Sequence, residues 1–201
     1  MDGSVRRLAG AVIVVLIFGV APAGVAGPLD APGATKALTC TACHGAGGQS
    51  PSNTMPILSG MWPVYFKKAI ADYAAGKRPS TEMEPYAKMV AQMGVDEVAA
   101  YFSAQPRAAT AVAVDPAAVE RGRTAAQECL QCHKPGGTTV GTAVVPDLRG
   151  QPPGYLLNQM RLFKQDRRSP GDPNLTKLKE LMGKISDQTL ADLAAYWSQA
   201  K

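Results

Sequence analysis

The sequence predicts an all-α fold in which two small helical domains follow one another along the chain. The stretches "VYFKKAIADYAAG" and "GYLLNQMRLFKQ" carry apolar residues at the i, i+3, i+4 spacing of a helix. No segment shows the convincing alternation of apolar and polar residues that a half-buried strand would have. The chain also repeats itself after about ninety residues, too long for a solenoid unit, which indicates a duplicated domain.

The first 26 residues have the layout of a secretory signal. Two arginines precede an apolar run from Leu8 to Val20, and small residues follow up to Ala26. The apolar run has 13 residues, whereas about 20 are needed to span a bilayer. We therefore expect residues 1–26 to be a cleaved signal peptide and the protein to be exported to the periplasm. An uncleaved membrane anchor is the alternative.

The repeat sets the expected domain boundaries. "CTACHG" matches "CLQCHK", "PILSG" matches "PDLRG", and "DEVAAYF" matches "LADLAAYW" in the same order along the chain. Between the two copies, "QPRAATAVAVDP" is rich in alanine and proline and poor in large apolar residues. We expect a first domain over 27–104, a linker over 105–116 and a second domain over 117–201. Domains of about 80 residues have little core and usually need a covalent or metal staple.

Charge and composition exclude several classes of function. Loss of the signal removes two arginines and one aspartate, which lowers the net charge from +5 to +4. The chain has no run of basic residues interleaved with aromatics, so nucleic acid is not an expected partner. The mild positive charge remains compatible with contact to an acidic protein or membrane surface. No nucleotide-binding fingerprint or catalytic triad is present, so a cofactor must carry any chemistry.

All four cysteines and both histidines lie in two C-x-x-C-H motifs, the first with Cys40, Cys43 and His44 and the second with Cys129, Cys132 and His133. A disulfide-exchange pair would be expected on a βαβ scaffold, which the pattern lacks. One zinc site is awkward because each histidine adjoins a cysteine, and no further ligand exists for a second. Covalent haem c fits: on a helix both thiols and the imidazole share one face, so the thiols can form thioethers while the imidazole reaches iron. The motifs predict two covalently attached haem c groups.

With these motifs in order, the chain resembles the two-domain class I cytochromes c of the cytochrome c4 type. It is also similar in architecture to the cytochrome subunit of flavocytochrome c sulfide dehydrogenase. The resemblance covers nearly the whole mature chain and rests on "CTACHGAGGQS", "PILSG", "YFKKAIADYAAGKR" and "STEMEP", and then on "CLQCHKPGG", "PDLRGQ", "YLLNQMRLFKQDRR" and "ISDQTLADLAAYW". It implies that each domain wraps a few helices around one haem, and that electrons pass between the domains.

The resemblance also implies roles for residues outside the motifs. Pro56 and Pro146 would offer their carbonyls to the imidazole Nδ1–H of His44 and His133, which fixes the ring and raises its basicity. An ordinary turn proline is the alternative for each. Arg78 and Arg168 would either pair with haem propionates or lie in solvent.

The sixth iron ligand is where the two halves differ. No third histidine exists, so a methionine thioether is the expected ligand. Met83 in "STEMEP" resembles the ligand segment of the family. The corresponding position of the second half holds Leu178, and Met182 follows one helical turn later, so Met182 is the candidate there. A vacant apolar face, or a lysine at 177 or 179, remains open.

We therefore expect a periplasmic diheme electron carrier rather than an enzyme. Its partners would be redox proteins: a terminal oxidase, a dehydrogenase or a flavoprotein subunit. The alternative is an enzyme or gas-binding protein that acts at an open second haem on small sulfur or nitrogen compounds. The distal face of the second half separates the two hypotheses, because only an iron without a sixth protein ligand can bind such molecules.

Overall fold

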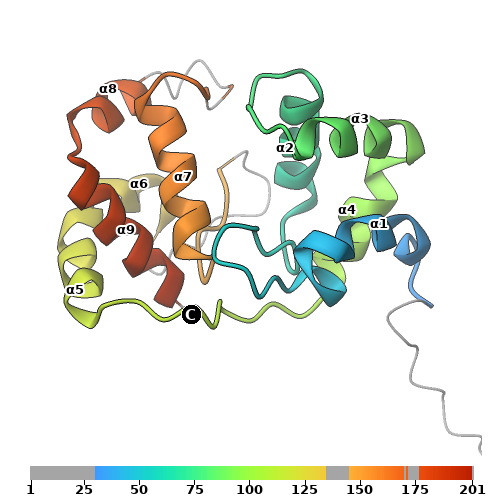
Figure 1. Ribbon diagram of the computed structural model, residues 1–201, viewed down its shortest axis with the longest axis horizontal. Coiled ribbons are helices and arrows are strands. Elements are labelled where there is room, and N and C mark those ends of the chain that lie inside the picture. The colour runs from blue at the N-terminus through green and yellow to red at the C-terminus, as the bar shows by residue number, and fades with distance from the viewer. Residues whose placement is uncertain (1–29, 135–144, 170, 172–176, 201) are drawn as a thin grey trace, which may run out of the picture.

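The computed structural model describes residues 30–134, 145–169, 171 and 177–200, and the regular elements in these ranges are all helical. The expected signal peptide lies outside the described residues. Within them, no helix combines the length and apolar character needed to cross a membrane. Figure 1 shows two lobes side by side, with α1 to α4 in one and α5 to α9 in the other.

The first domain has four α-helices and one short 3-10 turn. Pro63 opens α2, where its missing N–H costs nothing. Gly94 ends α3 and begins α4 with a positive φ of 110°, a conformation that glycine adopts without strain. The elements are α1 (Ala34–His44), η1 (Ala46–Gly48), α2 (Pro63–Ala74), α3 (Met83–Met93) and α4 (Val95–Ala104).

The second domain repeats this order with a differently built start. The chain up to the end of the second motif forms an α-helix, a 3-10 turn and a four-residue helix, whereas one continuous helix leads through the first motif. Asp115 caps the first of these by accepting from the N–H of Ala117, and Ser186 caps the last helix by accepting from Thr189. The elements are α5 (Pro116–Ala125), η2 (Ala126–Cys129), α6 (Leu130–His133), α7 (Pro153–Lys164), α8 (Lys177–Lys184) and α9 (Asp187–Gln199).

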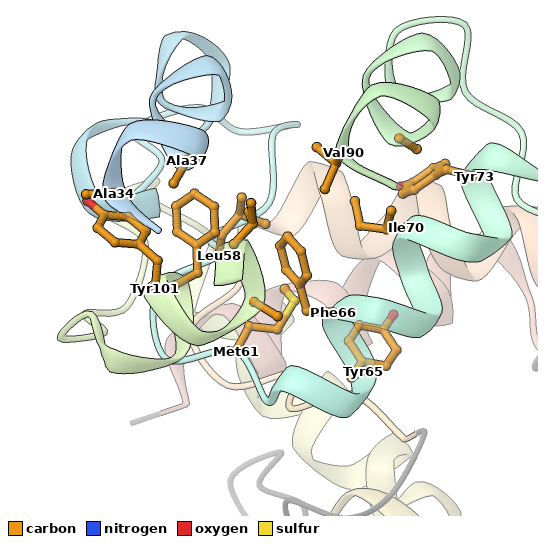
Figure 2. Close-up of a cluster of buried hydrophobic side chains, with 14 residues drawn as sticks. Ala34, Ala37, Leu58, Met61, Tyr65, Phe66, Ile70, Tyr73, Val90 and Tyr101 are labelled. Atoms are coloured by element: carbon orange, nitrogen blue, oxygen red, sulfur yellow. The ribbon is translucent and has the colours of Figure 1, made fainter. Parts of the chain in front are cut away.

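Each domain has its own apolar cluster. Figure 2 shows the first cluster, where side chains from all four helices of the first domain and from the loop before α2 converge. Phe66 and Phe102 lie with ring centroids 5.9 Å apart at its centre. In the second domain Trp197 of α9 is almost fully buried and packs near the ring of His133. Both clusters therefore adjoin a C-x-x-C-H motif.

The first and last helices of each domain cross where a glycine allows close approach. A Cβ on Gly122 would overlap the backbone carbonyl of Asp192, and a Cβ on Gly33 would overlap that of Glu97. These two glycines are equivalent in the repeat. In the second domain Arg121 also holds the crossing through two hydrogen bonds to Asp192, at 2.9 and 2.8 Å. The crossing fixes α1, which carries the first motif, and α5, which leads into the second.

The segment over 105–116 is bonded to both domains. The side-chain amide of Gln49 donates to the carbonyl of Ala108 and accepts from its N–H, both at 3.0 Å. Thr110 N–H donates to the carbonyl of Gly150 at 2.8 Å. The segment also passes over two equivalent glycines, because a Cβ on Gly60 would touch Arg107 and one on Gly150 would overlap Ala109. The segment that the composition predicts as a linker therefore packs against both lobes.

Candidate functional site

The two C-x-x-C-H motifs present their side chains in the same way. All four cysteines are free; the first of each motif is half-buried and the second is exposed. His44 is buried, with 4% of its surface exposed, and His133 is half-buried. Burial raises the pKa of the Cys40 and Cys129 thiols. Each motif therefore places two thiols and one imidazole at the edge of the domain core.

Each motif faces a cavity of its own. The cavity beside Cys40, Cys43 and His44, here the first cavity, has a volume of about 560 Å³. The cavity beside Cys129, Cys132 and His133, the second cavity, has about 620 Å³. Both volumes lie in the range of cofactor pockets.

Both histidines are oriented by a backbone carbonyl. His44 Nδ1 lies 2.8 Å from the carbonyl oxygen of Pro56, and His133 Nδ1 lies 3.2 Å from that of Pro146. A carbonyl can only accept, so Nδ1 carries the proton and Nε2 keeps its lone pair for a metal. Burial lowers the pKa of both histidines, which favours the neutral form that ligates.

The methionines singled out in the sequence line the same two cavities as the motifs. Met83, at the start of α3, is half-buried and lines the first cavity, and its N–H donates to Ser80 Oγ at 3.1 Å. Met182 of α8 is buried and lines the second cavity, as does Leu178. Lys179 forms an ion pair with Asp166. The side chain of the residue at 177 lies outside the described set.

Met160 of α7, which the sequence did not single out, also lines the second cavity. Its equivalent in the repeat is Ile70 of α2, which lines the first cavity and belongs to the core of that domain. An alignment of the two amphipathic helices would have identified Met160 as a residue that faces the cavity, because it places Met160 opposite Ile70. Because the first domain fills the position with an isoleucine, the position itself is one for apolar packing.

The two cavities share one wall at the domain boundary. Four residues line both of them: Met61, Tyr65, Tyr155 and Gln159. Figure 2 shows Tyr65 projecting from α2, a helix whose equivalent in the other lobe, α7, carries Tyr155. The two cavities are therefore neighbours within one molecule.

Across this wall the arginines of one domain bond to the tyrosines of the other. Arg78 Nη2 donates to Tyr155 Oη at 2.7 Å, and Arg168 Nη2 donates to Tyr65 Oη at 3.0 Å. Both guanidiniums also donate to the side-chain oxygen of Gln159, at 3.0 and 2.6 Å. Arg78 and Arg168 are 2% and 6% exposed. The sequence left haem propionates or solvent as their surroundings, and this burial excludes solvent.

This arginine cluster fits an anionic cofactor edge. Among the residues that the structure describes, neither guanidinium pairs with a carboxylate, and Arg168 Nε is buried without a partner. Burial alone would raise the pKa of Tyr65, but Arg168, Arg78 and Lys68 outweigh it and lower the pKa to about 8. Buried charges normally have partners. The carboxylates of two haems, with their porphyrins in the apolar cavities, would supply the negative charge that the protein lacks here.

Sequence comparison with known proteins agrees with two haem-binding domains. The profile of the cytochrome c family matches residues 119–201. Cytochrome c4 of Pseudomonas aeruginosa is 30% identical over 175 residues, which cover 83% of this chain and 86% of that protein. The thiosulfate dehydrogenase electron acceptor of Stutzerimonas stutzeri is 32% identical over 183 residues, which cover 81% of this chain and 79% of that one.

Solved structures agree with the fold. Reduced cytochrome c4 from Pseudomonas stutzeri superposes with a TM-score of 0.75 at 27% identity, covering 83% of this chain and 96% of that chain. Thiosulfate dehydrogenase from Marichromatium purpuratum superposes with a TM-score of 0.71 at 31% identity; the match covers 79% of this chain and 36% of that longer one. The chain therefore belongs to the cytochrome c4 family, the diheme class I cytochromes c.

Proposed function

We propose that this diheme electron-transfer protein works in the periplasm and accepts electrons from a dehydrogenase that oxidises thiosulfate. The observation that carries electron transfer is the pair of cavities with one shared wall, each with its own C-x-x-C-H motif. Two cofactors in cavities that share a wall would be neighbours, which favours electron exchange inside one molecule. The dehydrogenase partner is supported by the relatives named as thiosulfate dehydrogenase electron acceptors.

In this proposal the side chains divide the work of holding each haem. The two thiols of each motif would hold the porphyrin covalently, and the histidine and a methionine would be the protein groups that hold its iron. When bound, each haem supplies an iron that takes up and releases one electron. The ligand sets are Cys40, Cys43, His44 and Met83 in the first domain and Cys129, Cys132, His133 and Met182 in the second.

The carbonyls of Pro56 and Pro146 act behind these ligands. By accepting the Nδ1 proton they fix the ring orientation, so that Nε2 faces the cavity. They also make the imidazole a stronger donor to iron, which favours the ferric state. A methionine on the other side favours the ferrous state. The histidine and the methionine would therefore shift the reduction potential of each iron in opposite directions.

The periplasmic location is supported by the signal-like sequence over 1–26. If it is a signal, N-terminal sequencing of native protein should begin near Gly27. Recovery of the intact first residue in a membrane fraction would support the anchor instead.

The electron-acceptor role is tested by reduction kinetics. The holoprotein, fully oxidised, is mixed with thiosulfate and a catalytic amount of purified thiosulfate dehydrogenase, and haem absorbance is followed. We expect reduction of both haems only when enzyme and thiosulfate are both present. Reduction by thiosulfate alone would instead favour the enzyme hypothesis, and no reduction in any mixture would exclude this donor.

A further inference from the structure

The two loops that orient the histidines are each held from outside their own domain. We propose that Gln151 and Arg107 are positioning residues for His44 and His133 respectively, so that the docking of the two domains controls both histidine ligands. The proposal rests on the haem assignment but not on the identity of the electron donor.

The loop of the first domain is held by a neutral side chain from the second. Ile57 directly follows Pro56, whose carbonyl bonds to His44. Its N–H donates to Gln151 Oε1 at 2.9 Å, and its carbonyl accepts from Gln151 Nε2 at 2.8 Å. Gln151 is 3% exposed, so water does not compete for these bonds. A single amide therefore fixes both backbone groups next to the orienting carbonyl.

The loop of the second domain is held by a charged side chain from the segment between the domains. Asp147 directly follows Pro146, whose carbonyl bonds to His133. Arg107 Nη1 lies 3.6 Å from Asp147 Oδ2, and Arg107 Nη2 donates to the carbonyl of Arg149 and, at 3.5 Å, to that of Asp147. The side chains of Arg107 and Asp147 are only 11% and 6% exposed.

Position in the sequence makes both contacts depend on domain docking. Gln151 lies 94 residues after Ile57, and Arg107 precedes the loop it holds by 40 to 42 residues. The backbone next to Arg107 is itself fixed to the first domain by the two Gln49 bonds to Ala108. Separation of the lobes would remove the Gln151 contact and strain the Arg107 contact, which leaves each loop only the bonds within its own domain, such as Leu58 N–H to the carbonyl of Gly48 and Arg149 to Asp147. Both orienting carbonyls would then be less firmly placed than in the docked molecule.

The two positioning residues differ in charge, so the effects of replacing Gln151 and of replacing Arg107 can be told apart. Gln151 is neutral, so its loss changes only the position of the first loop. Arg107 opposes the negative charge of Asp147, whose carboxylate also acts electrostatically on His133. Its loss therefore both loosens the second loop and leaves more negative charge near the second iron, which stabilises the ferric form.

The test uses the oxidised holoprotein and follows the paramagnetically shifted NMR signals of each histidine ring, together with the two midpoint potentials. Arg107→Gln should shift the His133 signals and lower the potential of the second haem, leaving the His44 signals in place. Gln151→Leu should shift the His44 signals although the substitution is in the other domain. Arg123→Gln is the charge-matched control: Arg123 is exposed, pairs with Glu120 and lies over the ring of Tyr196, and neither of these two residues belongs to the loop that Arg107 holds.

Arg107→Lys separates charge from position and covers the case in which the glutamine variant does not fold. Lysine keeps the positive charge but not the forked donors, so the potential should return toward that of the wild type while the His133 signals stay shifted. The proposal is overturned if Arg107→Gln and Arg107→Lys leave the His133 signals where Arg123→Gln leaves them. It is equally overturned if Gln151→Leu leaves the His44 signals unchanged. These readouts involve no partner, so they are independent of the donor experiment.

Discussion

The two domains carry the same five-residue motif on differently built helices. In the first domain the motif lies in the last turns of one regular helix, α1. In the second it spans a 3-10 turn and the short helix α6, after α5 has ended at Ala125. The comparison teaches that the motif needs only its own turn to be helical. What precedes it can vary, and here a 3-10 turn stands between α5 and α6 where the first domain has one continuous helix.

The largest difference should appear when one motif is removed at a time. Cys129→Ala with Cys132→Ala should leave one covalent haem, on the first domain, and Cys40→Ala with Cys43→Ala should leave the one on the second. The reason is that each motif lines only its own cavity. Intact mass after acid–acetone extraction counts the haems. Loss of both haems from either variant would show that the domains do not mature independently.

The crossing of α5 and α9 in the second domain should not tolerate a side chain in place of the glycine at the contact. Gly122→Ala places a methyl group on the carbonyl of Asp192, so we expect it to destabilise the domain by about 3 kcal/mol. Gly183→Ala is the control in the same domain: its Cβ would meet nothing within 4 Å, and it should stabilise by about 0.5 kcal/mol. Denaturant unfolding measures both. Equal midpoints for the two variants would contradict the close approach.

The distal methionines should respond separately. Met83→Ala should weaken the near-infrared sulfur-to-iron band and lower the potential of the first haem. Met182→Ala should remove the sixth ligand from the iron of the second haem and leave the first haem unchanged. Carbon monoxide binding by the reduced protein counts the open irons. If wild-type protein already binds one equivalent, the second iron lacks a sixth protein ligand and the gas-binding alternative gains. If Met182→Ala changes neither spectrum, Met160 becomes the methionine to replace.

The smallest effect should come from the ion pair between Arg121 and Asp192, where α5 crosses α9. We expect it as a change of stability at acidic pH. Hydrogen bonds from Arg121 lower the pKa of Asp192 below its usual value. A lowered pKa in the folded state stabilises the protein above the unfolded pKa of about 4 and stops doing so as pH falls through the folded value. Thermal unfolding should therefore show wild type more stable than Asp192→Asn at pH 6, with the gap closing below about pH 4. A gap unchanged at pH 2.5 would assign it to packing.

Local sequence patterns predicted what depends on local structure. Helical spacing located α2 and α7, and the two motifs located the cysteines and histidines beside their cavities. The repeat made Arg78 and Arg168 equivalent, but it did not predict their burial, because each bonds to a tyrosine 77 or 103 residues away in the other domain. For the same reason an alanine-rich composition predicted a linker without revealing Arg107 as a contributor to the second cavity. Spatial partners across a domain boundary leave no periodic signal.

The crossed arginine–tyrosine bonds also bear on how the duplicated halves could evolve. After a duplication, two copies are normally free to drift apart, because each folds by itself. Here the tyrosine of each copy accepts from the arginine of the other, so Tyr65 is matched to Arg168 and Tyr155 to Arg78. A substitution at one of these four positions therefore also removes a bond made by the other half. The wall between the cavities should change only by paired substitutions, while the outer ends of the molecule diversify freely.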